Sequence, residues 1–402
     1  KTSGRDLLIE GGGPRGTLYG AYTLLDKLGC RWYAHDLTVI PRRATVIVPE
    51  LDETVKPGFE YREVFIKEAQ GKDWAARNRL NGHFTALDES RGGKVVYYPW
   101  CHSFAALVPP AKYFQSHPEY YSLIGGRRRA VRGQLCLSNP EVLRIATETA
   151  LGWIREHPEA TFLSISQNDG EGWCECENCR RIETEEGGHS GPILRFVNEI
   201  AKAVEKVDPA KRIDTLAYLY SEEPPLKARP WRNVRVRMAP IGNCQAHPYE
   251  SCPRNRPFMA HFKGWSKITS QLYVWHYITD FAQYLLPYPN FDELAADVAM
   301  YHRNGVRGLF LQGAVSEGGG GEFAELRSWV LARMLWDPSA GFWAAVDEFL
   351  KAYYGQGAPY LREYIERMHR VVRFPPAGLG RSIWAFRSAE FPEEFGAGAL
   401  AL

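Results

Sequence analysis

Short apolar runs alternate with longer amphipathic segments through most of the chain. From residue 60 onward each run is rich in Val, Ile, Leu and aromatic residues, and most are followed by a segment with apolar residues at helical spacing. Strands of a parallel sheet are buried on both faces, so they appear in sequence as such continuous runs. The pattern predicts eight strands: Glu60–Ile66, Gly82–Ala86, Tyr97–Phe104, Thr161–Gln167, Thr215–Tyr220, Val234–Pro240, Gln271–Tyr277 and Val306–Gln312.

The segments between these strands predict helices. Apolar positions recur on one face in Pro140–Glu156, Ile193–Val207 and Phe291–Asn304, and a helical tail runs from Glu325 to about Arg373. Strands that alternate with helices indicate an α/β fold, and eight such units predict a (β/α)8 TIM-type barrel. We therefore expect the barrel at residues 57–324 and a helical C-terminal extension at 325–402, whose Pro- and Gly-rich end from residue 374 predicts no element.

The first 56 residues have a different organisation. They predict a short strand at Asp6–Ile9, a helix at Thr17–Leu28 that Gly29 ends, and strands at Arg31–Tyr33 and Thr45–Val48. Residues 1–56 therefore indicate the remainder of a small α/β domain.

Glycines 11–13 and 16 follow the first predicted strand, as in a dinucleotide-binding turn. Pro14 and Arg15 interrupt the required glycine spacing, and no acidic residue follows a second strand at the expected distance. The sequence also lacks the G-x-S-x-G, H-E-x-x-H, P-loop and EF-hand patterns. We therefore expect no nucleotide site, no catalytic metal and no serine nucleophile.

Charge and composition narrow the possible partners. The formal net charge is +2, which gives no electrostatic argument for binding to nucleic acid or to an anionic membrane surface. Aromatic residues make up 13% of the chain, and many lie near predicted strand ends, where they could hold the apolar faces of sugar rings. Lys1 opens directly into a structured pattern, so the start looks trimmed, and we expect a secreted or periplasmic protein, with a cytoplasmic one as the alternative.

The residue best placed to act as a proton donor is Asp169. It follows the apolar run that begins at Phe162, directly before Gly170, and therefore lies at the carboxyl end of a predicted barrel strand. Active sites of such barrels lie at this end. A carboxylic acid in a partly dry cleft can protonate a leaving group, as glycoside hydrolysis requires. The alternative role for Asp169 is to cap a loop or a helix.

Most glycoside hydrolases need a second carboxylate as nucleophile or base. Glu222, Asp280 and Glu317 follow the fifth, seventh and eighth predicted strands, and each could instead be an ordinary loop acid. Asp280 is favoured slightly because it ends a segment that also carries several aromatic side chains.

Further polar and aromatic residues near strand ends are candidates for substrate binding. A guanidinium at the mouth could bind a hydroxyl pair or a carboxylate, but Arg62 could instead belong to a buried ion pair. The histidine of the seventh strand could equally be structural. The candidates are Arg62, His102, Asn168, Trp275, His276, Tyr277 and Gln312.

Cys174, Cys176 and Cys179 form a C-x-C-x-x-C run just after Asp169. Three thiolates need a fourth ligand for a structural zinc site, and Cys136, Cys101 and His189 are candidates. Disulfides are the competing interpretation if the protein is exported.

Several segments together resemble the bacterial DUF4838 proteins. They include residues 15–22 with 29–32, 117–121 with 134–137, 166–170 with the three cysteines, 190–198, and 325–327 with 335–338. The family is similar to the α-glucuronidases and the β-N-acetylhexosaminidases, in which a small α/β domain precedes the barrel. The resemblance implies an exo-acting glycoside hydrolase with Asp169 in the position of the acid. Where the hexosaminidases have an Asp-Glu pair, this chain has Asn168-Asp169, so acetamido-assisted catalysis is not implied.

Three functions follow as hypotheses. The first is an exo-acting hydrolase for a terminal acidic or N-acetylated sugar, which requires no cofactor for catalysis. The second is a non-catalytic carbohydrate-binding protein on a degenerate barrel. The third is a polysaccharide lyase with a His or Tyr base. Two carboxyl groups about 5–10 Å apart across the mouth would favour hydrolysis, and a lone acid would favour binding.

Overall fold

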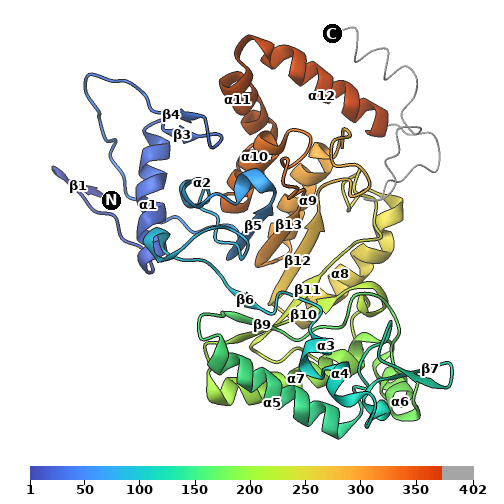
Figure 1. Ribbon diagram of the computed structural model, residues 1–402. Coiled ribbons are helices and arrows are strands. Elements are labelled where there is room, and N and C mark those ends of the chain that lie inside the picture. The colour runs from blue at the N-terminus through green and yellow to red at the C-terminus, as the bar shows by residue number, and fades with distance from the viewer. Residues whose placement is uncertain (374–402) are drawn as a thin grey trace.

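The computed structural model describes residues 1–373, and its centre is a parallel sheet of seven strands (Figure 1). From β6 onward each crossover returns the chain to the neighbouring strand, the last strand, β13, pairs with β5, and β5 and β6 are the two edges of the sheet. The order across the sheet is β5-β13-β12-β11-β10-β9-β6. These strands are β5 (Tyr61–Phe65), β6 (Tyr97–Tyr98), β9 (Phe162–Ser164), β10 (Arg212–Ala217), β11 (Val234–Met238), β12 (Leu272–Tyr277) and β13 (Gly308–Gln312).

Side chains of each strand alternate between the interior of the sheet and the surrounding helices, as the two-residue period requires. In β12, Tyr273 and Trp275 pack in an interior aromatic cluster, whereas Val274 belongs to the core beneath the helices. The register fixes this alternation across the sheet, with Val274 opposite Leu309 and Trp275 opposite Phe310.

The sheet curls until its two edge strands touch, but no strand joins them. The Tyr61 ring of β5 lies 5.5 Å from the Tyr97 ring of β6. Between them Asn81 donates its N–H to the Arg62 carbonyl and accepts the N–H of Val95. Residues 82–86, predicted as the second strand, form turns instead. The predicted parallel α/β architecture is therefore confirmed, whereas a complete eight-stranded barrel is not found in residues 1–373.

The predicted third strand is shorter than expected, because β6 ends at Tyr98 and the chain turns before His102. The longest predicted helices are confirmed within a few residues. Asn139 caps the start of the first of them by accepting the Glu141 N–H, and Pro140 occupies its first turn. These helices are α5 (Pro140–Glu156), α7 (Ser190–Val207) and α9 (Phe291–Arg303). The shorter helices α2 (Lys72–Arg77), α3 (Phe104–Leu107) and α4 (Pro110–Tyr113) precede α5, and α6 (Glu177–Glu186) and α8 (Arg256–Ile268) lie between the long ones.

The predicted helical tail forms three helices, α10 (Ala324–Trp336), α11 (Phe342–Tyr354) and α12 (Ala358–Arg373). α10 packs directly against β5, and α11 packs against both α10 and α12. The remainder of the expected extension, residues 374–402, lies outside the described residues. None of the helices described within 1–373 is long and apolar enough to span a membrane.

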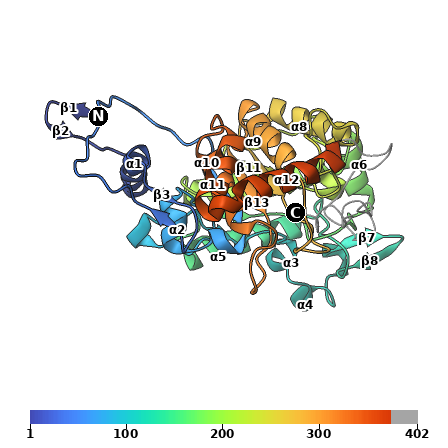
Figure 2. The same cartoon turned by 90° about the horizontal axis from the view of Figure 1, so that it is seen from above.

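The N-terminal segment lies at one end of the molecule, where α1 (Pro14–Lys27) packs beside the C-terminal helices (Figure 2). Tyr19 contacts Trp336 edge to face, and Arg31 pairs with Glu348 at 2.7 Å. The strand predicted at Thr45–Val48 is not formed. The short strand pairs are β1 (Thr2–Ser3) with β2 (Asp6–Leu7), β3 (Arg31–Trp32) with β4 (Thr38–Val39), and β7 (Ser122–Ile124) with β8 (Arg127–Arg129).

A fully buried ion pair lies inside the curled sheet. Arg237 of β11 donates to Asp214 of β10 at 2.7 Å, and each side chain is at most 1% exposed. The guanidinium lies 4.2 Å from the Trp100 ring centre and 5.1 Å from those of Tyr97 and Trp275. Desolvation raises the pKa of Asp214 to about 6, although Arg237 opposes this shift. The pair and its rings fill the space below the carboxyl ends of the strands.

Removing one partner of this pair should strongly destabilise the protein. In Asp214→Ala the Arg237 charge stays buried without its counter-ion, so we expect the free energy of unfolding to fall by about 3–5 kcal/mol. Urea denaturation measures this loss. Glu148→Ala breaks an exposed pair with Arg144 and should cost at most about 0.5 kcal/mol. Equal losses in the two variants would contradict the stabilising role of the buried pair.

Candidate functional site

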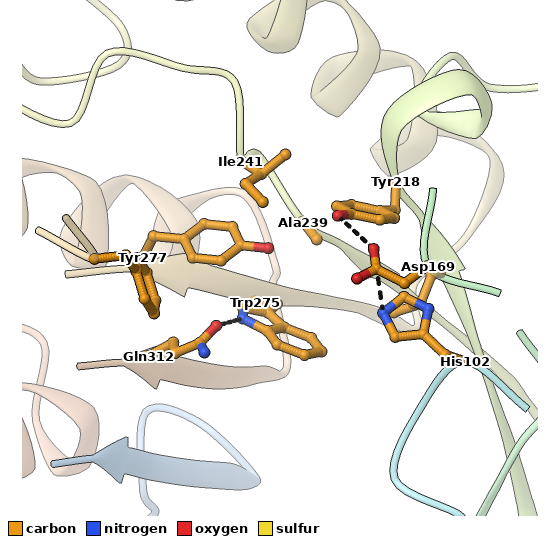
Figure 3. Close-up of a pocket in the computed structure, with 10 residues that line it drawn as sticks. His102, Asp169, Tyr218, Ala239, Ile241, Trp275, Tyr277 and Gln312 are labelled. Atoms are coloured by element: carbon orange, nitrogen blue, oxygen red, sulfur yellow. Dashed lines mark hydrogen bonds and ion pairs between the residues drawn. The ribbon is translucent and has the colours of Figure 1, made fainter. Parts of the chain in front are cut away.

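A cavity of about 310 Å³ opens at the carboxyl ends of the strands (Figure 3). Its walls come from the ends of β10 and β12, from Gln312 at the end of β13, and from the loops that follow β6, β9, β11 and β12. Convergence of strand ends at one edge is a direct consequence of parallel topology. The lining residues are His102, Asp169, Leu216, Tyr218, Ala239, Ile241, Trp275, Tyr277, Phe281 and Gln312.

Asp169 is the single carboxylate among these lining residues of the described chain. Its side chain is 72% exposed. The Tyr218 hydroxyl donates to Oδ1 at 3.0 Å, and Figure 3 shows the other carboxylate oxygen pointing toward the cavity. Burial and the adjacent charge of Asp169 raise the pKa of Tyr218, so its hydroxyl keeps its proton at neutral pH. One carboxylate oxygen is thus oriented by Tyr218 while the other faces the cavity.

The second polar group beside Asp169 is His102. Its Nδ1 lies 2.8 Å from the Gln167 carbonyl, an acceptor, so Nδ1 carries a proton. Nε2 then points toward Asp169, 4.0 Å from Oδ1. The backbone of His102 has a φ of 52°, an uncommon left-handed conformation for a residue with a side chain. Its N–H donates to Ser166 Oγ, which holds this conformation and aims the ring.

Aromatic and apolar side chains form the opposite wall. Trp275 Nε1 donates to Gln312 Oε1 at 2.6 Å, which fixes the indole beside the amide. Tyr277 lies next to Trp275, and burial raises the pKa of its hydroxyl. Ile241 lines the same cavity. The site therefore combines a carboxylate and a histidine on one side with aromatic faces on the other.

The loop that carries Asp169 is held by a buried glutamine. Gln134 donates from Nε2 to the carbonyls of Asn168, Gly170 and Glu171 at 3.1–3.2 Å, and its Oε1 accepts the Asn168 N–H at 2.8 Å. Gly172 has a φ of 94°, and a Cβ there would lie 2.5 Å from the Arg132 carbonyl oxygen, so the loop requires glycine at this position.

The three cysteines that follow Asp169 lie next to Cys136, and the four sulfur atoms are all within 4.8 Å of one another. Of the candidates for a fourth ligand, Cys136 is therefore the one beside the run. Cys101 and His189 lie outside the group, and His189 pairs with Glu183 instead.

The sequence profile of the DUF4838 family, a domain of unknown function, matches residues 32–366. The chain belongs to the DUF4838 family. No curated protein matches it.

Three solved structures of glycoside hydrolases are similar to part of this chain at low identity. A GH138 enzyme targeting pectin rhamnogalacturonan II is 13% identical, with a TM-score of 0.49 over 90% of this chain and 48% of its own. An O-GlcNAc hydrolase from Thermobaculum terrenum is 11% identical, with a TM-score of 0.38 over 57% of this chain and 48% of its own. A glucosidase from Croceicoccus marinus is 13% identical, with a TM-score of 0.26 over 50% and 55%. The matches span about half of each of these chains.

Five of the residues proposed from the sequence of this DUF4838 protein meet at the cavity. Asp169, His102, Trp275, Tyr277 and Gln312 all line it, because each follows or ends a strand with the side chain directed inward.

Three of the proposed binding residues lie elsewhere. Arg62 points outward from β5, where it donates to the Phe59 and Arg79 carbonyls and lies over the Tyr19 and Trp336 rings. His276 also points outward, because it alternates with Trp275, and it contacts Glu293 at 2.6 Å. Asn168 uses its amide to bind Ala105 N–H and the Gly133 carbonyl. The structure therefore does not bring these three side chains to the cavity, and for Arg62 and His276 it favours the structural alternative.

The candidates for a second carboxylate are also outside the cavity lining. Asp280 is 1% exposed and accepts the Ala282 N–H, as a turn-capping residue does. Glu222 pairs with His261 at 2.8 Å, and Glu317 lies in an exposed turn. Proximity to a strand end was not enough to identify a residue of the cavity.

The sequence analysis missed Tyr218, Gln134 and Arg237. Tyr218 was inside a predicted strand, and its inward direction follows from alternation with Ala217. Gln134 lies in a loop far from Asp169 in sequence, so only the structure brings them together. Arg237 is the fourth residue of β11 and the second basic one in its alternation of apolar and basic residues, a signal that a charged side chain enters the interior.

Replacing the buried glutamine should loosen the loop of Asp169. In Gln134→Leu, three carbonyls lose their donor, and each buried unsatisfied group costs about 1–3 kcal/mol. We expect amide exchange in residues 168–173 to accelerate at least about tenfold, as measured by hydrogen–deuterium exchange mass spectrometry. Asn198→Leu is the matched control, because Asn198 bridges Arg229 and Trp231 far from this loop. Unchanged exchange in Gln134→Leu would refute the positioning role.

Proposed function

We propose that this protein is a glycoside hydrolase that removes a terminal sugar. In this reaction Asp169 would donate a proton to the glycosidic oxygen. The observation that carries this proposal is the position of one carboxylate, oriented by Tyr218 and next to His102, in a cavity at the carboxyl ends of the strands. Proton donation to the leaving oxygen is the step that such a carboxyl group performs in glycoside hydrolysis.

The size of the cavity supports exo action on one sugar ring. Its volume of about 310 Å³ is near the lower end of the range for ligand sites, about 300–1,000 Å³. A site this small suits a single terminal residue better than a section of polymer. Trp275, Tyr277 and Phe281 offer apolar faces for the C–H side of the ring.

The polar side of the cavity supports recognition of an acidic or N-acetylated sugar. Gln312 lines the cavity and brings its amide nitrogen, a donor, to it, whereas His102 Nε2 is an acceptor there because the ring proton lies on Nδ1. The amide donor suits a sugar carboxylate or an acetamido carbonyl, and both side chains suit hydroxyl groups. Gln312 is oriented for this because Trp275 occupies its Oε1.

Within the proposed reaction, Asp169 Oδ2 faces the glycosidic oxygen and Tyr218 is the positioning residue. Its hydrogen bond to Oδ1 fixes the plane of the carboxyl group, which determines the direction of proton transfer. The nearest hydroxyl to the carboxylate is also that of Tyr218, and tyrosine serves as the nucleophile in one class of glycoside hydrolases.

A specific observation favours a second candidate, a non-catalytic carbohydrate-binding protein. Most glycoside hydrolases use two carboxylates, whereas Asp169 is the single one among the lining residues of the described chain. The same cavity would then hold a sugar without cleaving it.

Substitution of the proposed acid distinguishes the two functions. In Asp169→Asn no proton can be donated, so turnover of chromogenic glycosides should fall at least about 100-fold, the scale of general acid catalysis. The panel should include glucuronides, sialosides, N-acetylhexosaminides and neutral glycosides. The matched control is Glu317→Gln, which removes a carboxylate outside the cavity lining and should keep full activity.

Sugar binding measured by calorimetry completes this test. If the Asp169→Asn variant keeps its turnover, Asp169 is not the proton donor. Binding of a panel sugar without any turnover by the native protein would favour the carbohydrate-binding function.

Loss of the Tyr218 hydroxyl should reduce turnover without abolishing it. In Tyr218→Phe the ring still fills its place, but Asp169 loses a hydrogen bond of about 1.5–3 kcal/mol. We therefore expect kcat to fall roughly 10- to 100-fold with little change in KM. Steady-state kinetics on the best panel substrate measures both. A complete loss comparable to that of Asp169→Asn would instead identify Tyr218 as the nucleophile.

A further inference from the structure

Four cysteines from two distant segments form a compact cluster beside the loop of Asp169. Cys136 precedes α5, and Cys174, Cys176 and Cys179 lie between β9 and the first turn of α6. We call these residues the four-cysteine cluster. Three of the four are buried, with 2–4% of their surface exposed, and Cys176 is partly buried. Thiols at these positions are held together by the fold itself, since the two segments are joined through Gln134 and its neighbours.

The spacing of the sulfur atoms fits tetrahedral coordination. The Sγ atoms of Cys136 and Cys176 are 3.7 Å apart. In a tetrathiolate zinc site with Zn–S distances of about 2.3 Å, neighbouring sulfur atoms lie about 3.8 Å apart. A disulfide would need about 2.05 Å, and none of the four cysteines of the cluster is in a disulfide.

Two N–H groups donate to one of the sulfur atoms, and a hydroxyl group lies against the other three. The Leu123 N–H donates to Cys174 Sγ at 3.3 Å, and Arg128 Nη1 lies 3.7 Å from the same atom. Ser138 Oγ lies 3.2 Å from Cys179 Sγ and 3.6 Å from those of Cys136 and Cys176. Such outer donors stabilise the negative charge of metal-bound thiolates and orient them.

We propose that the four-cysteine cluster binds one zinc ion as a structural site. Four sulfur ligands close the coordination sphere, so the ion has no open position for substrate or water and stabilises the fold rather than the reaction. This inference does not depend on the proposed hydrolase activity.

The site would connect three parts of the structure. Cys174 lies five residues after Asp169, Cys136 precedes α5, and the β7–β8 hairpin supplies Leu123 and Arg128. Gln134 binds the first part of this loop, residues 168–171. Zinc would bind its last part, at Cys174. The ion stabilises the position of Asp169 without contacting the cavity.

Metal analysis of the native protein, purified under reducing conditions without chelator, is the direct test. We expect about one zinc per chain by plasma mass spectrometry. Cys176→Ser should lose most of this zinc, and Cys30→Ala should keep it, because Cys30 lies outside the cluster. Absence of zinc from protein folded in zinc-containing buffer, or zinc retained fully in Cys176→Ser, would overturn the proposal.

A second measurement covers the case in which Cys176→Ser fails to fold. Removal of the metal from the native protein with a strong chelator should lower Tm by roughly 5–10 °C, and added zinc should restore it. Cobalt(II) added in place of zinc should give the visible spectrum of a tetrahedral tetrathiolate complex. An unchanged Tm, an octahedral cobalt spectrum, or disulfides among these cysteines found by mass spectrometry would refute the site.

Discussion

The interior of the curled sheet is organised around one buried charge. The Arg237 guanidinium needs Asp214 as its counter-ion and the Trp100 and Trp275 rings as its neighbours, because a lone charge there would be very unfavourable. Its partners come from β10, β12 and the loop after β6, so it links the neighbours of β11 across the interior to β6, a strand that is not hydrogen-bonded to β11. The Trp275 ring that contacts Arg237 on one side also lines the cavity. Core and site are therefore parts of the same packing arrangement.

Regular elements with long apolar patterns were predictable, and irregular ones were not. Strands β9 to β13 and helices α5, α7 and α9 follow directly from continuous apolar runs and helical spacing. The predicted strand at 82–86 failed because His83 and Phe84 are packed as a turn against Trp100, which a one-dimensional pattern cannot distinguish from a strand.

The same distinction applies to the site. Asp169, Trp275 and Tyr277 were predictable because a strand end gives their position and alternation gives their direction. Arg62 and His276 show the limit of that reasoning, since a shift of one residue along a strand turns a side chain from the cavity to the helices. Gln134 could not be found at all, because its role depends on a loop 34 residues away.

The missing strand has a mechanical consequence. A tube with a lengthwise slit resists twisting far less than a closed tube. In this sheet the slit lies between β5 and β6, where contacts between side chains such as Tyr61 and Tyr97 take the place of backbone hydrogen bonds. Every residue that lines the cavity comes from β6 through β13 and the loops after them, the part in which each strand is bonded to the next. The slit borders β6, which pairs with β9 and whose following loop carries His102, so twisting at the slit would act first on the side of the cavity that holds His102 and Asp169.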